Sequence, residues 1–259
     1  MMDTKKWVVA TGAIVVACTV TMGFPEAAHA VPLTCQRTVA RESSRYVQSV
    51  VKALVRCEDR RVVGRLPAST DCQTDATTAS VIQRAHDKLA IRAASNCGGP
   101  DRACGSADDD PLASIGWGSG VCPNLQGAAC NNPIANCNDI STCLTCVGSA
   151  EARQAISLYY DALVSSTFGS ASTLNRCQRA IGREAARFHR LKSLALQRCW
   201  DARLRGLHSN ACPVPGDGKA GPKIQGSEAG MRTKICRACG DGDRLCGGGD
   251  DFTPSQIDL

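Results

Sequence analysis

The feature of this sequence that most constrains its fold is an internal repeat at an offset of 142 residues. Cysteines, arginines, aspartates and a glycine-rich loop all recur at that offset. The matched pairs include Cys35 and Cys177, Arg37 and Arg179, Arg41 and Arg183, Arg45 and Arg187, Cys57 and Cys199, Asp59 and Asp201, Cys97 and Cys239, and Cys104 and Cys246. Chance does not produce so many matches at one offset, so the chain contains two copies of one structural unit.

Each copy has the pattern of two helices. In the first copy, the apolar side chains of residues 35–57 fall on one face of a helix and the arginines fall on the opposite face. Gly64 and Pro67 end that helix, and a second helical pattern covers residues 76–94. The pattern predicts an antiparallel helical hairpin.

Cysteines flank both helices of this hairpin. Cys35 and Cys57 are about six helical turns apart, so they point the same way at opposite ends of the first helix. We therefore expect Cys57 to bridge to Cys72 beside the turn and Cys35 to bridge to Cys97 at the open end, although spacing alone leaves other pairings open. Each bridge would stabilise the fold by about 2–4 kcal/mol. The matching cysteines of the second copy are Cys177, Cys199, Cys212 and Cys239.

The second copy repeats the pattern less cleanly. Its first helix runs from Cys177 to about Leu204, but Pro222 and Gly230 are poor residues for the interior of its second helix. We expect a long loop over residues 213–221 and a shorter helix that starts near Pro222. This copy is truncated relative to the first, so it is either a natural terminal half or part of a longer array.

The loops that close the two copies also contain cysteines. We expect Cys104 to bridge forward to Cys122. We expect Cys246 to bridge back to Cys236, which the first copy lacks because Ala94 stands at that place.

The segment between the copies is rich in cysteine. Five cysteines within residues 122–146 indicate a knot of loops or short turns, and residues 150–165 have the pattern of one amphipathic helix. The predicted fold class is therefore all-α, with two disulfide-stapled antiparallel helical hairpin repeats joined by a cysteine-rich insert. The expected divisions are a signal peptide (1–30), a first hairpin repeat with an acidic loop (31–112), the insert (113–148), an amphipathic helix and linker (149–172) and a truncated second hairpin repeat (173–259).

The N-terminal residues have the pattern of a secretory signal. An apolar run follows Lys5 and Lys6, and residues 28–30 form a small-x-small cleavage site, so we expect cleavage after Ala30 and no transmembrane segment in what remains. A loose lipobox over residues 15–18 leaves a lipoprotein anchored through Cys18 as the alternative. Of the 17 cysteines, all but Cys18 follow the signal, which leaves an even number for pairing. The chain is expected to be secreted, periplasmic or held at the outer surface.

Two Cys-x-x-Cys motifs, at residues 143–146 and 236–239, suggest redox or zinc chemistry. In an exported chain with an even number of cysteines, the favoured interpretation is that each cysteine bridges to a more distant partner. No histidine follows either motif, so haem attachment is not indicated.

Closely spaced aspartates among glycines in the two closing loops suggest oxygen ligands for Ca²⁺. The alternative is a solvated acidic turn beside Arg102 or Arg244. The candidate ligands are Asp101, Asp108, Asp109, Asp243, Asp250 and Asp251.

Arginines step by four residues along the first helix of each copy, and the net charge is +6. Such rows suit a polyanion at the cell surface, although no aromatic residues interleave as a stacking platform would require. The alternative is a solvated helix face with Glu42 and Glu184 as local partners. The candidate polyanion-binding residues are Arg37, Arg41, Arg45, Arg179, Arg183 and Arg187.

Several runs suggest a family. These are Cys-Gln-Arg-Ala-Ile-Gly at 177–182, Arg-Cys-Trp-Asp-Ala-Arg-Leu-Arg-Gly at 198–206, the closing Cys-Gly-x-x-Asp-Arg-x-Cys-Gly loop, and the run from 137 to 146 followed by Tyr-Tyr-Asp-Ala-Leu at 159–163. Together they resemble a group of exported, cysteine-rich bacterial proteins. The resemblance covers nearly the whole chain after the signal and implies repeated helical pairs with disulfides, but it assigns no site residues.

No catalytic constellation stands out. After the signal, the histidines are His86, His189 and His208, which are far apart and do not recur between the copies. The leading hypothesis is a non-enzymatic structural or interaction protein of the cell envelope, without a cofactor other than a possible calcium ion. The alternatives are a calcium- or polyanion-binding protein and a thiol-disulfide redox protein.

Overall fold

The computed structural model describes residues 32–125, 127, 129–160 and 171–252. Within these residues the regular structure is five helices, and the only strand pairing is an isolated bridge between Val121 and Pro133. The helices are α1 (Pro32–Val62), α2 (Ala76–Cys97), α3 (Cys137–Tyr160), α4 (Ala171–Leu204) and α5 (Ala220–Cys239). The predicted all-α class is confirmed. The expected signal peptide (1–30), Cys18, residues 161–170 of the linker and the last residues (253–259) lie outside the described residues.

Two disulfide-stapled hairpins form the frame of the molecule. In the first, α1 and α2 are joined by Cys57–Cys72 beside the turn and by Cys35–Cys97 at the open end, as expected. In the second, α4 and α5 are joined by the repeat-related bridges Cys199–Cys212 and Cys177–Cys239. The open-end bridge closes a separation of 62 residues in both copies, so the two hairpins are built alike.

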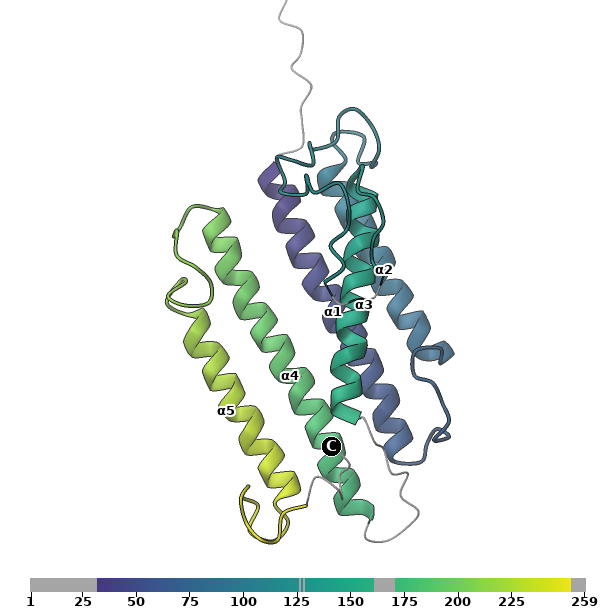
Figure 1. The fold of residues 1–259 in the computed structure, drawn as a ribbon, viewed down its shortest axis with the longest axis vertical. Coiled ribbons are helices and arrows are strands. Elements are labelled where there is room, and N and C mark those ends of the chain that lie inside the picture. The colour runs from purple at the N-terminus through teal and green to yellow at the C-terminus, as the bar shows by residue number, and fades with distance from the viewer. Residues whose placement is uncertain (1–31, 126, 128, 161–170, 253–259) are drawn as a thin grey trace, which may run out of the picture.

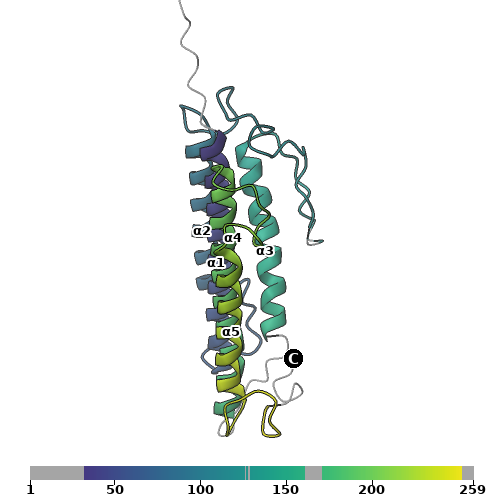
Figure 2. The ribbon, with the colours of Figure 1, turned by 90° about the vertical axis from the view of Figure 1, so that its left-hand side faces the viewer.

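The two hairpins lie side by side with α1 against α4 (Figure 1). Helices α2, α1, α4 and α5 form one layer, and α3 packs on one face of it (Figure 2). Arg37, near the start of α1, contacts Asp201, near the end of α4, so these two central helices are antiparallel. Arg179 and Asp59 form the repeat-related contact at the other end of the same interface. The hairpins are therefore related by an approximate two-fold axis, as in a self-complementary dimer.

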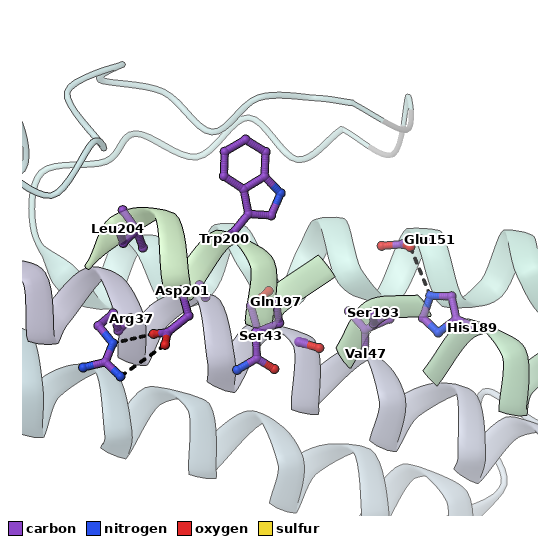
Figure 3. A pocket seen from close by; sticks show the side chains of 12 residues that line it. Arg37, Ser43, Val47, Glu151, His189, Ser193, Gln197, Trp200, Asp201 and Leu204 are labelled. Carbon is purple, nitrogen blue, oxygen red and sulfur yellow. Dashed lines mark hydrogen bonds and ion pairs between the residues drawn. The ribbon is translucent and has the colours of Figure 1, made fainter. Parts of the chain in front are cut away.

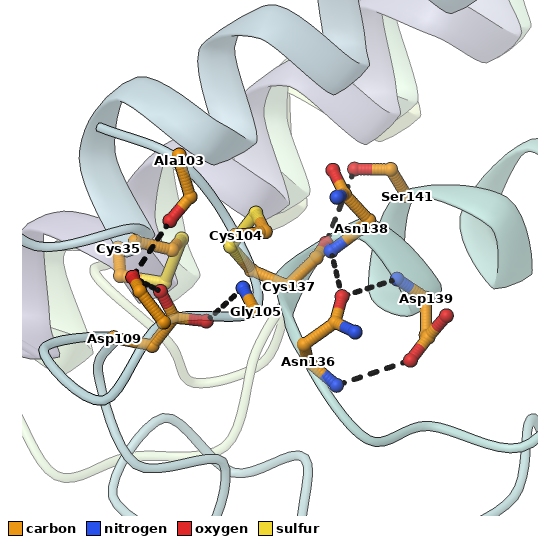
Figure 4. The surroundings of a disulfide bond; sticks show 12 residues. Cys35, Ala103, Cys104, Gly105, Asp109, Asn136, Cys137, Asn138, Asp139 and Ser141 are labelled. Carbon is orange, nitrogen blue, oxygen red and sulfur yellow. Dashed lines mark hydrogen bonds between the residues drawn. A yellow bond between two sulfur atoms is a disulfide. The ribbon is translucent and has the colours of Figure 1, made fainter. Parts of the chain in front are cut away.

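Helix α3 begins at Cys137, 13 residues before the position expected from periodicity. The carbonyl oxygen of the Asn136 side chain accepts a hydrogen bond from the backbone N–H of Asn138 at 2.8 Å. In return, the carboxylate of Asp139 accepts a hydrogen bond from the backbone N–H of Asn136 at 3.1 Å (Figure 4). This reciprocal cap satisfies the first free N–H groups of the helix. The second half of the insert is thus a helix and not a set of short turns.

The bridges of the insert tie α3 to the loops around it. Cys104 is bonded to Cys137 (Figure 4), and Cys122 to Cys143. The expected Cys104–Cys122 bridge is therefore wrong. The prediction failed because α3 starts early. The early start brings Cys137, and not Cys122, next to Cys104 in the first acidic loop. A third bridge joins Cys130 to Cys146.

Helix α5 begins two residues before the predicted start at Pro222. The Asp217 carboxylate accepts hydrogen bonds from the backbone N–H groups of Lys219 and Ala220 at 2.9 and 2.8 Å. Pro222 falls in the first turn, where its missing N–H costs no helical hydrogen bond. The helix is 20 residues long against 22 for α2, which agrees with the prediction of a shorter helix.

The apolar core is unevenly divided between the hairpins. A large cluster lies among α1, α2 and α3, with Leu54 and Leu89 almost fully buried. The cluster inside the second hairpin consists of Ala195, Cys199 and Ala220. Because two of these are alanines and the third is a disulfide cysteine, little apolar area is buried there. The second hairpin therefore depends more heavily on its disulfides and on its contact with α1.

Candidate functional site

The arginine rows predicted from the sequence both lie along the contact between α1 and α4. Arg37 is ion-paired with Asp201 of the other hairpin, and Asp201 also contacts Arg205 at 3.2 Å. Asp59 is contacted by Arg183 at 2.5 Å and by Arg179 at 3.6 Å. These rows therefore join the hairpins as well as facing solvent.

The local acidic partners expected for these rows are also present. The carboxylate of Glu42 is buried and is contacted by Arg41 at 3.0 Å and by Arg45 at 2.7 Å. Its repeat-related counterpart Glu184 is contacted by Arg187 at 3.8 Å and by a lysine of α5 at 3.1 Å. The arginines nevertheless keep much of their surface, with side-chain exposures of 44% for Arg41 and 55% for Arg45. Because a guanidinium has five donors, donors remain for a ligand.

A basic groove surrounds Asp59 at one end of the α1–α4 contact, and we call it the Asp59 groove. Its volume is about 800 Å³. Seven lysines and arginines line it against a single carboxylate, that of Asp59. The seven cations are Arg45, Lys52, Arg56, Lys88, Arg183, Arg187 and Arg190.

A second groove of about 950 Å³ surrounds Asp201 at the other end of the contact, and we call it the Asp201 groove. Six lysines and arginines line it against two carboxylates, those of Asp201 and Asp217. The six cations are Arg37, Arg41, Arg198, Arg205, Lys219 and Lys223. The two grooves are related by the repeat, since Arg56 and Asp59 in one correspond to Arg198 and Asp201 in the other.

Both grooves open on the same face of the four-helix layer. Along α1, Arg37 and Arg41 border one groove and Arg45 and Lys52 the other, and these positions fall within one stripe of the helix. No residue of α3 lines either groove. We call the surface that these two grooves form along the α1–α4 contact the basic face, and on it the cations far outnumber the anions.

The acidic loops satisfy their own backbone. Asp109 accepts a hydrogen bond from the N–H of Gly105 at 2.8 Å, and Asp251 accepts the repeat-related bond from Gly247. The carboxylate of Asp250 accepts bonds from the N–H groups of Gly242 and Asp243 at 3.1 and 3.3 Å. These bonds supply a structural reason for the recurrence of the aspartates. Carboxylate oxygens of residues 243, 250 and 251 also lie within 4.8 Å of one another, and the calcium site stays a prediction.

The Cys-x-x-Cys motifs lack free thiols. Cys143 is bonded to Cys122 and Cys146 to Cys130, so neither bridges within its motif. The second motif behaves alike, because Cys236 is bonded to Cys246, as expected, and Cys239 to its partner in α4. The eight disulfides pair all 16 cysteines of the described residues. Thiolate chemistry at these motifs would first require reduction.

Sequence reasoning missed Tyr160 of α3, which inserts between α1 and α4. Its ring is buried, and its hydroxyl donates a hydrogen bond to the Asp59 carboxylate at 3.3 Å. Burial, reinforced by the negative charge of Asp59, raises the pKa of the Tyr160 hydroxyl. No sequence signal identifies this contact, because tyrosine at the end of an amphipathic helix is equally suited to a solvent-exposed place.

Comparison with known protein families, curated proteins and solved structures returns no match for this chain. None of the described helices combines the length and the apolar character needed to span a membrane. Fold and site together define a disulfide-stabilised all-α protein in which two related hairpins, joined by ion pairs, present a basic face.

Proposed function

We propose that this chain is an exported, non-enzymatic binding protein whose basic face binds polyanions at the cell surface. The observation that carries the proposal is the pair of repeat-related grooves, in which 13 lysines and arginines face three carboxylates. Local fields of this kind concentrate anions and hold sulfate, phosphate or carboxylate groups by charge-assisted hydrogen bonds. Export is supported by the predicted signal at residues 1–30 and by eight disulfides, which fit a non-cytoplasmic protein.

The chemistry of the face favours an acidic glycan or a phosphate-rich lipid headgroup over single-stranded nucleic acid. Arginine and lysine dominate both grooves, and neither groove contains a tryptophan, tyrosine or phenylalanine. Base stacking on aromatic side chains provides much of the affinity for single strands, so those ligands would lose that contribution here. Regularly spaced anions, in contrast, can reach both grooves along the α1–α4 contact.

The test is binding to heparin as a sulfated probe. The triple variant Lys52→Ala, Arg56→Ala, Arg190→Ala removes three exposed cations of the Asp59 groove and leaves the ion pairs of Asp59 in place. The dissociation constant should rise at least tenfold. The slope of log K against log salt concentration should fall by about one for each lost contact.

The matched control removes three exposed cations that line neither basic groove, by Arg65→Ala, Arg153→Ala, Lys192→Ala. The change in net charge is the same as in the groove variant, so its affinity should stay within about twofold of the parent chain at constant salt. An equal loss of heparin affinity in the two variants would mean that net charge alone explains binding. That result would contradict the proposal of a specific binding face.

Calcium binding is the second candidate, and it rests on the proximity of the carboxylates of Asp243, Asp250 and Asp251. Addition of millimolar CaCl₂ should raise the melting temperature, because a ligand that binds only the folded state stabilises it. The variant Asp243→Asn should abolish that rise. A melting temperature that is the same in CaCl₂ and in EDTA would leave these loops with a purely structural role.

A further inference from the structure

The Asp59 groove and the Asp201 groove adjoin one another along α1. Arg45 borders the first and Arg41 the second, and these two arginines are about one helical turn apart. The side chain of Glu42, which both arginines contact, is 2% exposed, so it adds little negative surface between the grooves. The basic face is therefore one cationic surface and not two separate patches.

Cations on α1 follow the length of this surface. Most of them are four residues apart, which corresponds to about 6 Å along the helix axis. At a rise of about 1.5 Å per residue, α1 covers about 33 Å between Arg37 and Asp59, which lie at opposite ends of its contact with α4. The cations of α1 that line the two grooves are Arg37, Arg41, Arg45, Lys52 and Arg56.

Helix α4 supplies a second row of cations that runs in the opposite direction, in which Arg183 corresponds to Arg41 of α1. The ion pair of Arg37 with Asp201 lies at one end of the two rows (Figure 3), and the ion pair of Arg183 with Asp59 lies at the other. On α1 and α4, no described residue that lines a groove between these ends carries a carboxylate. The two rows thus flank an uninterrupted cationic seam.

Both grooves contain cations that are free to bind a ligand. Four cations of the Asp59 groove and three of the Asp201 groove are exposed and take part in no ion pair within the described residues. A ligand can therefore bind without breaking the ion pairs that join the hairpins. The four are Lys52, Arg56, Lys88 and Arg190, and the three are Arg198, Lys219 and Lys223.

We propose that the basic face binds a linear acidic glycan along the α1–α4 seam, with one chain occupying both grooves. This inference rests on the proposed function and adds the form of the ligand, an extended chain that spans at least about 33 Å. An acidic glycan carries anionic groups along its whole length, whereas a lipid headgroup presents its phosphates at one point and would fill one groove at a time. Binding in the second groove is intramolecular for a chain already held in the first, so length should increase affinity.

The experiment compares a heparin tetrasaccharide, which is shorter than the seam, with a dodecasaccharide, which is longer. Isothermal titration calorimetry of the full, disulfide-intact chain measures affinity and stoichiometry at constant salt. The tetrasaccharide should bind with two fragments per chain, one in each groove. The dodecasaccharide should bind with one fragment per chain, and its dissociation constant should be at least about a hundredfold lower.

Protein variants assign the effect of length to the two grooves. The triple variant of the Asp59 groove is matched by Arg198→Ala, Lys219→Ala, Lys223→Ala in the Asp201 groove, which removes the same charge and no ion pair. Either variant should raise the dodecasaccharide's dissociation constant to about that of the tetrasaccharide. For the tetrasaccharide, each should remove one of the two sites and leave the affinity of the other within about twofold. Circular dichroism and melting temperature establish that each variant is folded.

The outcomes separate this inference from the proposed function. Equal affinity per site for the two fragments, with two of either bound per chain, would overturn the bridging chain and leave polyanion binding intact. Absence of binding by both fragments would overturn polyanion binding as well. Saturable binding to vesicles of anionic phospholipid, without any gain in affinity from fragment length, would assign the grooves to lipid headgroups and overturn the inference.

Discussion

Arg37 of the first hairpin is ion-paired with Asp201 of the second, although 164 residues separate them in the sequence. The internal repeat places Arg179 opposite Asp59 in the same way. A single arginine-to-aspartate contact is thus made twice by one repeated unit. Such reciprocity is the property of isologous interfaces between identical subunits, and here it joins two halves of one chain.

The two aspartates of this interface should differ in their effect on stability. The side chain of Asp59 is 10% exposed and is contacted by two arginines and Tyr160, whereas that of Asp201 is 26% exposed. Asp59→Asn should lower the free energy of unfolding by about 1–3 kcal/mol, because the buried hydroxyl of Tyr160 and two arginines lose a charged acceptor. Asp201→Asn should cost less, about 0–1 kcal/mol, because solvent screens its ion pairs. Urea unfolding measures both, and equal losses would contradict this ranking.

The close approach of Tyr160 to Gly182 can be tested by a double-mutant cycle. Gly182→Ala places a Cβ against the tyrosine ring and should lower the free energy of unfolding by about 1–3 kcal/mol through overpacking. In a Tyr160→Ala background that cost should disappear, because the ring is gone. Gly226→Ala is the control, since an added Cβ there meets open space within helix α5 and should stabilise by up to about 1 kcal/mol. A Gly182→Ala cost that persists without the ring would contradict the contact.

At alkaline pH, the free energy of unfolding should depend on the ionisation of the Tyr160 hydroxyl. The pKa of its hydroxyl is raised in the folded state, so folding favours the protonated form. That contribution is fully present below the unfolded pKa of about 10 and is lost as pH rises above it, at up to about 1.4 kcal/mol per pH unit. Between pH 9 and pH 11 the free energy of unfolding should therefore fall more steeply in the parent chain than in Tyr160→Phe. Parallel pH curves for the two proteins would show that Tyr160 is solvated in solution.

The second hairpin should unfold locally when its open-end disulfide is removed. Its own apolar cluster is small, whereas the first hairpin packs against α3. Cys177→Ala with Cys239→Ala should destabilise that hairpin by about 2–4 kcal/mol. Hydrogen exchange should then show loss of protection in α5 while α2 stays protected. Cys35→Ala with Cys97→Ala is the matched pair, because it opens the same 62-residue separation, and it should leave protection in α2 largely intact.

Local patterns predicted the parts of the fold that local physics decides. The helical periodicity of each copy and the position of the cysteines at helix ends were sufficient for the four bridges of the two hairpins, since a disulfide requires its two Cα atoms to lie within a few ångströms. The early start of α3 also had a local signal, the reciprocal cap of Asn136 and Asp139. Apolar periodicity alone overlooked it, and the Cys104–Cys122 prediction failed as a consequence.

The sequence by itself determined that this chain forms two like hairpins, because cysteine spacing and amphipathic periodicity repeat at one offset. Only the tertiary structure decided how those hairpins meet. A row of arginines gives the same sequence pattern whether it faces solvent or another helix. The antiparallel contact of α1 with α4 is what brings Arg37 to Asp201. The same packing buried Tyr160 between α1 and α4, where its hydroxyl donates to Asp59. Such contacts depend on the relative placement of distant helices, which no local pattern specifies.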